Sequence, residues 1–113
     1  MDNPDPKNRV KDIAIRNMNG KTVLSPVTAL TYKNSDQLET LFNLLFNKNI
    51  TEMILDLKQV GFLDSKALET IVDMQSKLTA AGGNLTLANL NDVCRDILIC
   101  VRLMNRFSVI GQT

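Results

Sequence analysis

The chain has 113 residues, which is enough for one compact domain with its own core and too few for two ordinary domains. Apolar residues make up 44% and charged residues 22% of the sequence, as is typical of a soluble globular protein. The 13 basic and 12 acidic residues leave a net charge of +1, so no global field favours nucleic acid or an acidic membrane. No apolar run approaches the roughly 20 residues that span a bilayer. We therefore expect neither nucleic-acid binding nor direct membrane insertion.

The first residues of the chain, 1–11, are polar and include Pro4 and Pro6. They contain no apolar segment of the kind that forms the core of a secretory signal. We expect a polar N-terminal tail over 1–11, a single domain over 12–113 and a cytoplasmic location.

The residue types that most often carry catalysis are scarce. The chain has no His, which removes the commonest general base near neutral pH and a Ser-His-Asp triad. Cys94 and Cys100 fall in a helical pattern without the roughly four clustered ligands that zinc requires, so we expect free thiols. A Gly-rich nucleotide loop is also missing. We expect no enzyme, no metal and no cofactor.

The pattern over residues 12–32 predicts a β-hairpin. Residues 12–16 alternate between apolar and polar, Asn19-Gly20 is a strong tight-turn signal, and residues 21–25 read as the second strand. Pro26 should end or bend that strand. Extended backbone is expected to resume over 27–32.

From residue 34 onward, the pattern alternates between helix and strand. Asn34 and Ser35 are good N-cap residues for a first helix, which should end near residues 47–49. A second helix should begin after Asp64, and Asn91 with Asp92 should cap a third. Strands are expected over 52–57, 84–89 and 107–110. Such alternation implies parallel strands joined by right-handed crossovers.

The faces of the second and third helices follow from the same pattern. The second should carry an apolar stripe and end at Gly82-Gly83. On its wet face, Asp73 and Lys77 are placed to pair at i, i+4. The expected apolar positions are Leu68, Ile71, Val72 and Leu78 in the second helix and Val93, Ile97, Leu98 and Val101 in the third.

The stretch 53–71 is the expected location of a working site. A buried strand ends there, a helix begins, and Asp64 and Ser65 lie side by side at the join. The start of a helix gathers free backbone N–H groups at one point. Asp56, within the buried strand, is more simply explained as a structural hydrogen-bonding residue than as a chemical one.

Three features in register resemble a known family. The first is Leu55-Asp56-Leu57 followed by Val60 and Phe62, and the second is Asp64-Ser65 followed by Leu68. The third is the double glycine followed by Leu85, Leu87, Val93 and Leu98. Together they resemble a STAS domain, which anti-sigma factor antagonists share with the cytoplasmic ends of sulfate transporters. The resemblance covers about residues 12–110. It implies an α/β STAS fold with a mixed, mostly parallel sheet, an N-terminal hairpin and three to four helices.

The resemblance also implies a mechanism without enzymatic activity. A small STAS protein of the anti-sigma factor antagonist type captures an anti-sigma factor that is also a serine kinase of the histidine-kinase-like ATPase fold, and this frees the sigma factor. Phosphorylation at the start of the second helix ends the capture, and a phosphatase resets it. A phosphate adds about −1.5 to −2 charges at neutral pH, which a partner surface fitted to a neutral hydroxyl would reject.

The sequence departs from the family pattern at the switch itself. Ser65 matches the first hydroxyl of the family's loop, but Lys66 stands at the usual phosphoacceptor and Ala67 replaces a glycine. Ser65 is therefore the candidate phosphoacceptor, although its side chain could instead cap the helix. Arg102 also stands where a glycine commonly precedes the leucine matched by Leu103.

The implied partner-binding surface combines the loop before the first helix with the start of the second helix. Three alternatives remain beside capture of an anti-sigma factor: a helix cap with no further role, an accessory subunit that docks on a transporter ATPase, and an enzyme. The implied surface consists of Thr31, Tyr32, Lys33, Asp64, Ser65, Lys66, Ala67, Leu68 and Glu69.

Overall fold

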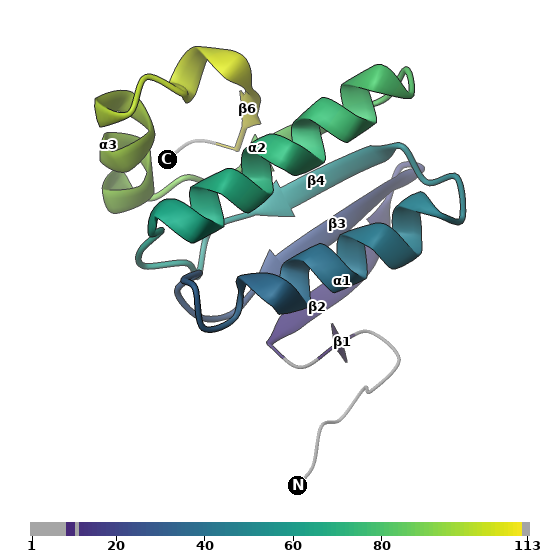
Figure 1. Ribbon diagram of the computed structural model, residues 1–113, viewed down its shortest axis with the longest axis horizontal. Helices are drawn as coiled ribbons and strands as arrows, with labels where there is room; N and C mark the ends of the chain where they lie inside the picture. The colour runs from purple at the N-terminus through teal and green to yellow at the C-terminus, as the bar shows by residue number, and fades with distance from the viewer. Residues whose placement is uncertain (1–8, 11, 112–113) are drawn as a thin grey trace, which may run out of the picture.

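A six-stranded sheet runs through the whole fold in the computed structural model, which describes residues 9, 10 and 12–111 (Figure 1). The strands lie side by side in the order in which they occur along the chain. They are β1 (Arg9–Val10), β2 (Ile13–Met18), β3 (Lys21–Pro26), β4 (Glu52–Asp56), β5 (Asn84–Ala88) and β6 (Ser108–Ile110).

The sheet is mixed and mostly parallel. β1, β2 and β3 pair antiparallel, whereas β3, β4, β5 and β6 pair parallel. Each parallel connection contains a helix, and α1 and α2 lie across one face of the sheet while α3 lies toward the β6 edge (Figure 1). The helices of the described chain are α1 (Ser35–Phe46), α2 (Ser65–Ala80), α3 (Asp92–Cys100) and the short 3-10 helix η2 (Met104–Arg106). This architecture confirms the predicted fold class.

The N-terminal hairpin forms where the sequence predicts it. Asn19 and Gly20 both have positive φ, 53° and 83°, as the tight turn between β2 and β3 requires. Extended backbone does not resume over 27–32: apart from one isolated bridge between Leu30 and Leu63, this segment is a loop. Of the expected tail, 1–8 and 11 lie outside the described residues, and Arg9–Val10 pair with β2 at the sheet edge.

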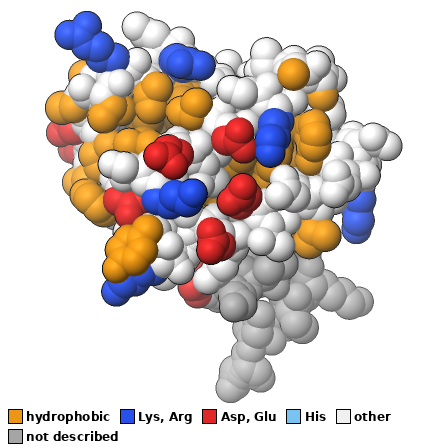
Figure 2. All heavy atoms as spheres, viewed as in Figure 1, with side chains coloured by type: hydrophobic (Ala, Val, Ile, Leu, Met, Phe, Trp, Pro, Cys, Tyr) orange, Lys and Arg blue, Asp and Glu red, His pale blue; other side chains and the backbone are white. Residues whose placement is uncertain are grey.

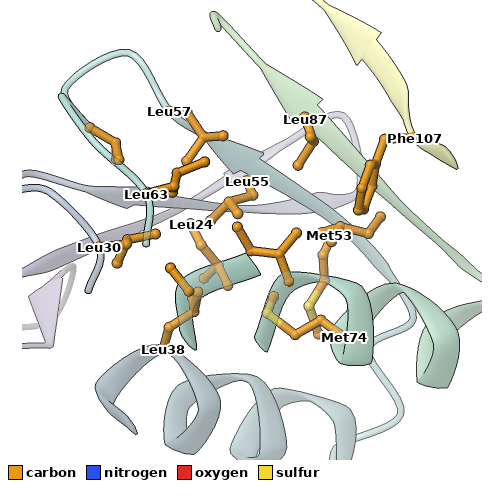
Figure 3. Packing of buried hydrophobic residues seen from close by; sticks show 14 of the residues in the cluster. Leu24, Leu30, Leu38, Met53, Leu55, Leu57, Leu63, Met74, Leu87 and Phe107 are labelled. Atoms are coloured by element: carbon orange, nitrogen blue, oxygen red, sulfur yellow. The ribbon is translucent and has the colours of Figure 1, made fainter. Parts of the chain in front are cut away.

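The hydrophobic core fills the space between the sheet and the helices (Figure 3). The inward-facing residues of β4, Met53 and Leu55, lie at its centre, and neighbouring strands and helices pack around them. Leu24, Leu38, Met74, Leu87 and Phe107 are among the buried side chains that surround them.

The end of α2 depends on its two glycines. Gly82 has φ +84°, a left-handed conformation that a Cβ disfavours. At Gly83, a Cβ would collide with the backbone oxygen of Thr51, which accepts the N–H of Asn84 at 2.9 Å. The pair therefore turns the chain directly into β5, in line with the prediction.

The prediction of which α3 residues face the core is wrong in part. Cys94 and Leu98 are fully buried, whereas Val93 and Val101 leave 48% and 46% of their surface exposed. Ile99 is exposed as well, at 53%. The helix therefore packs through one narrow line of residues and leaves apolar side chains outside the core.

A second apolar cluster lies on the other face of the sheet, apart from the main core. It consists of Val23, Ile54 and Ala88, which alternate with the core-facing residues of their strands. Beside it, the Asp56 carboxylate accepts hydrogen bonds from the Lys58 N–H and from Asn89 Nδ2, each at 3.0 Å. These bonds give Asp56 the structural role that the sequence predicts.

Candidate protein-binding site at the start of helix α2

Two segments far apart in the sequence join at the start of α2. The N–H of Leu30 donates to the backbone oxygen of Phe62 at 3.0 Å, and the N–H of Asp64 donates back to the oxygen of Leu30 at 3.2 Å. A third bond runs from the N–H of Tyr32 to Asp64 Oδ2 at 2.7 Å, across 32 positions of sequence. The loop before α1 is therefore fixed against the loop before α2.

The Asp64 carboxylate is the centre of this junction. Its Oδ1 accepts the N–H of Ala67 at 2.9 Å, which caps α2, while Oδ2 accepts the N–H of Tyr32. Hydrogen bonds from backbone N–H groups, with that of Ala67 the strongest, hold the pKa of Asp64 below its ordinary value of 3.8. The carboxylate is therefore ionised at neutral pH and uses both of its oxygens to organise the surface.

The loop before α1 has its own internal order. The backbone oxygen of Thr31 accepts the Ser35 N–H at 2.9 Å and the Ser35 hydroxyl at 2.7 Å. The Thr31 N–H in turn donates to Asn34 Oδ1 at 2.8 Å. Because these bonds occupy the backbone, the loop presents the side chains of Tyr32 and Lys33 outward, and Tyr32 is 69% exposed.

Eight of the nine expected partner-binding residues have surface that a partner could reach. Tyr32, Lys33, Ser65, Lys66 and Glu69 are exposed, and Thr31, Asp64 and Leu68 are partly exposed. The prediction is wrong for Ala67, which lies in the first turn of α2 and is fully buried. Its small side chain belongs to the core, and only its N–H takes part in the junction, through Asp64.

The two residues at the unusual switch position are both accessible. Ser65 is exposed at the first position of α2, and it is Asp64, not Ser65, whose side chain caps the helix. Lys66 has 48% of its side chain exposed and lies 3.9 Å from Glu69, a loose surface ion pair. The ammonium group is therefore available to a partner.

Phe62 belongs to the same surface, and the sequence interpretation missed it. Its place in an apolar stretch gave no indication of exposure, yet 49% of its surface is exposed. Neighbouring residues of extended backbone point to opposite sides, so the inward position of Leu63 directs Phe62 outward. That alternation was the available signal.

Other kinds of site find little support in the described part of the chain. No group of three His, Cys, Asp or Glu side chains converges there as metal ligands. Both thiols are free, with Cys94 buried and Cys100 exposed. Among the residues described, no helix has the length and apolar character needed to cross a membrane.

Comparison with known proteins agrees with this fold. The profile of the STAS domain matches residues 12–110, so the chain belongs to the STAS domain family. No curated protein matches the sequence.

Several solved structures are similar to the chain. One is a candidate anti-sigma factor antagonist from Thermotoga maritima, with 20% identity, a TM-score of 0.82 and coverage of 89% of this chain and 86% of that one. Another is an anti-sigma-factor antagonist (STAS) domain protein from Planctomyces limnophilus, with 19% identity, a TM-score of 0.79 and coverage of 90% and 92%. A sulfate transporter family protein from Wolinella succinogenes has 15% identity, a TM-score of 0.74 and coverage of 98% and 88%. At these identities, the likeness shows the shared fold.

Proposed function

We propose that this chain is a regulatory binding module of the anti-sigma factor antagonist type. It captures an anti-sigma factor that is also a serine kinase of the histidine-kinase-like ATPase fold, and it has no catalytic role of its own. The observation that carries the proposal is the junction at Asp64, which joins loop 31–33 and the start of α2 into one surface. Membership of the STAS family supports this class of partner.

The chemistry of the surface indicates what the partner presents. Tyr32 and Phe62 offer exposed aromatic area, which is the residue type that most often anchors a protein interface. Lys33 and Lys66 add two positive charges beside it. A partner patch with an apolar pocket and carboxylates at its rim would complement this arrangement.

Regulation at this surface would differ from the family's usual switch because Lys66 cannot accept a phosphate. Ser65 is exposed and is the remaining candidate phosphoacceptor at the helix start. Its phosphate would bring about −1.5 to −2 charges next to the ionised Asp64, which already bonds the free N–H groups there. The added charge would weaken binding to an acidic partner patch, and a phosphatase would restore it.

The test begins with affinity purification of the chain from its native cell, followed by mass spectrometry. This step identifies the bound protein and reports any phosphate on Ser65. Binding of the purified partner is then compared by calorimetry for wild type, Lys66→Glu and Ser65→Asp. We expect each variant to bind about tenfold or more weakly, because a charge at the interface changes sign or appears.

Lys48→Glu is the matched control for the charge change. Lys48 is an exposed residue just beyond the C-terminal end of α1. The surface that joins loop 31–33 to the start of α2, the docking surface, adjoins the N-terminal end of α1 instead. The control should bind like wild type. Equal binding by all of these variants would rule out this surface as the site of capture.

A second function has one specific observation in its favour. The match with the sulfate transporter family protein covers 98% of this chain, and an accessory role needs no phosphorylation, which fits Lys66 at the usual phosphoacceptor position. The chain could then dock on a transporter ATPase as an accessory subunit. Recovery of a membrane transport complex in the same purification, without an anti-sigma factor, would favour this function over the first.

A further inference from the structure

A small hollow lies on the face of the sheet opposite α1 and α2. It has a volume of about 210 Å³, and its floor is the second apolar cluster, formed by Val23, Ile54 and Ala88. Met18 of β2 and Ile110 of β6 also line it, and they keep 39% and 42% of their surface exposed. Figure 2 shows the other side of the molecule, which α1 and α2 cover and on which acidic and basic side chains intermingle. The hollow is therefore a separate feature from the docking surface.

Two opposite charges meet in the lining of the hollow. The guanidinium group of Arg16 on β2 lies 3.8 Å from Asp56 Oδ2 on β4. This separation is too long for a hydrogen bond, and 55% of the Arg16 side chain is exposed. The guanidinium therefore has N–H donors available for a second carboxylate, which arginine binds through two parallel hydrogen bonds.

The Asp56 carboxylate uses its two oxygens unequally. Oδ1 accepts the two bonds of 3.0 Å described above, from the Lys58 N–H and from Asn89 Nδ2. Within the part of the chain that the structure describes, Oδ2 has only longer contacts, with the Ser25 hydroxyl at 3.4 Å and with Arg16 at 3.8 Å. Asp56 is only 9% exposed, and a buried carboxylate oxygen usually accepts shorter bonds. Oδ2 therefore has capacity for a donor that enters the hollow.

The pairing of these two groups decides the charge of the ligand. A simple anion would bind Arg16 but would lie beside the negative charge of Asp56, and a simple cation would meet the reverse situation. A ligand with one charge of each sign complements both groups. Because the guanidinium and Oδ2 lie 3.8 Å apart, the two charges of the ligand must also be close together.

An α-amino acid meets these requirements, since a single carbon atom separates its carboxylate from its ammonium group. An aliphatic side chain on that carbon would cover the apolar floor of the hollow. The volume of about 210 Å³ is below the roughly 300–1,000 Å³ of sites for drug-sized molecules, so the hollow fits a ligand of amino-acid size.

We propose that this hollow binds a free α-amino acid with an aliphatic side chain of about the size of leucine. The ligand carboxylate pairs with Arg16, its ammonium group donates to Asp56 Oδ2, and its side chain lies on the cluster of Val23, Ile54 and Ala88. This binding site is a property beyond the proposed capture of an anti-sigma factor. Its residues are not those of the docking surface, so the two proposals can fail independently.

Titration of the purified chain with L-leucine, followed by methyl nuclear magnetic resonance, tests the proposal. The signals of Val23 and Ile54 should shift and saturate with a dissociation constant of about 1 mM, an affinity within the usual range of binding free energy per atom for small ligands. The absence of a saturable shift up to about 20 mM would overturn the proposal.

Two analogues of leucine separate the two charged contacts. 4-Methylpentanoate lacks the ammonium group and 3-methylbutylamine lacks the carboxylate, while both keep the aliphatic chain. Each should bind about tenfold or more weakly than L-leucine, because one charged group of the hollow is then left without its counterpart. If either analogue binds as tightly as L-leucine, the corresponding contact does not form and the proposal is wrong.

Arg16→Gln with Lys21→Gln as its matched control tests the site in the protein. Lys21 is exposed and lies on the same face of β3 as Val23, but it does not line the hollow. Both changes remove one positive charge. Arg16→Gln should weaken the binding of L-leucine about tenfold or more, whereas Lys21→Gln should bind like wild type. An equal loss in both variants would mean that only net charge matters, and it would contradict the proposed site.

Discussion

At the scale of single residues, Asp64 connects the stability of the fold to the geometry of the docking surface. Because its carboxylate accepts N–H groups from both Ala67 and Tyr32, its pKa is lowered in the folded state relative to the unfolded chain. As pH falls below the unfolded value, the unfolded chain binds the proton first, and the stabilisation by Asp64 is lost until the folded pKa is also passed. The contribution is complete above that window.

The corresponding prediction concerns Asp64→Asn. The amide can still cap α2 through its oxygen, but it lacks the second acceptor and the ionisation. Between about pH 5 and pH 2, the free energy of unfolding should fall less steeply in the variant than in wild type. Urea unfolding over this pH range measures both slopes. An unchanged slope would show that Asp64 is not the group whose pKa the fold lowers.

The backbone conformation of Arg102 leads to a second prediction, on the free energy of unfolding. It follows α3 with φ +62°, and the N–H of Leu103 bonds back to the Leu98 oxygen at 2.8 Å, so the helix ends in a position that favours glycine. Arg102→Gly should raise the free energy of unfolding by about 0.5–1 kcal/mol. Arg102→Ala should not, because alanine keeps the Cβ. Urea unfolding at low protein concentration compares the two, and a stabilising alanine would point to the arginine side chain as the source of the strain.

At the scale of elements, α3 shows how narrowly a short helix can be buried. Leu98 is fully buried and Ile99, the next residue, is 53% exposed. Leu98→Ala should lower the free energy of unfolding by about 2–4 kcal/mol because it opens a cavity. Ile99→Ala should change it by less than about 0.5 kcal/mol, because half of that side chain is already in contact with water. Thermal or urea unfolding of the pair measures this difference. Similar losses in both variants would contradict the burial pattern.

The same helix marks the limit of what the sequence could predict. Apolar residues occupy most positions from Val93 to Val101, so periodicity alone does not identify the core-facing line. The side of α3 that faces the core is marked by Cys94, whose thiol lies 3.1 Å from the backbone oxygen of Val60. This contact joins segments that are distant in the sequence. Longer helices with sparser apolar residues, such as α1, were predicted with nearly correct bounds.

The candidate site was predictable as a location but not as a surface. A helix start at Asp64 and Ser65 follows from local rules, but Ser65 was open between helix cap and phosphoacceptor, and in the structure the Asp64 side chain caps α2. The bond from the Tyr32 N–H to Asp64 depends on how two loops meet in space, and the resemblance alone placed them together beforehand. The burial of Ala67 likewise depends on tertiary packing, which the apolar pattern does not encode.

At the scale of the whole molecule, the proposed capture links stability to the concentration of the partner. A partner that binds only the folded chain stabilises the folded state by mass action, so the unfolding temperature must rise with partner concentration. At a partner concentration of about a hundred times the dissociation constant, the free energy of unfolding should rise by about 2.7 kcal/mol. Scanning calorimetry of such mixtures measures the shift. Lys66→Glu should show a smaller rise, and Lys48→Glu should follow wild type, since Lys48 lies at the other end of α1. A flat wild-type midpoint would mean that the purified partner does not bind the folded chain.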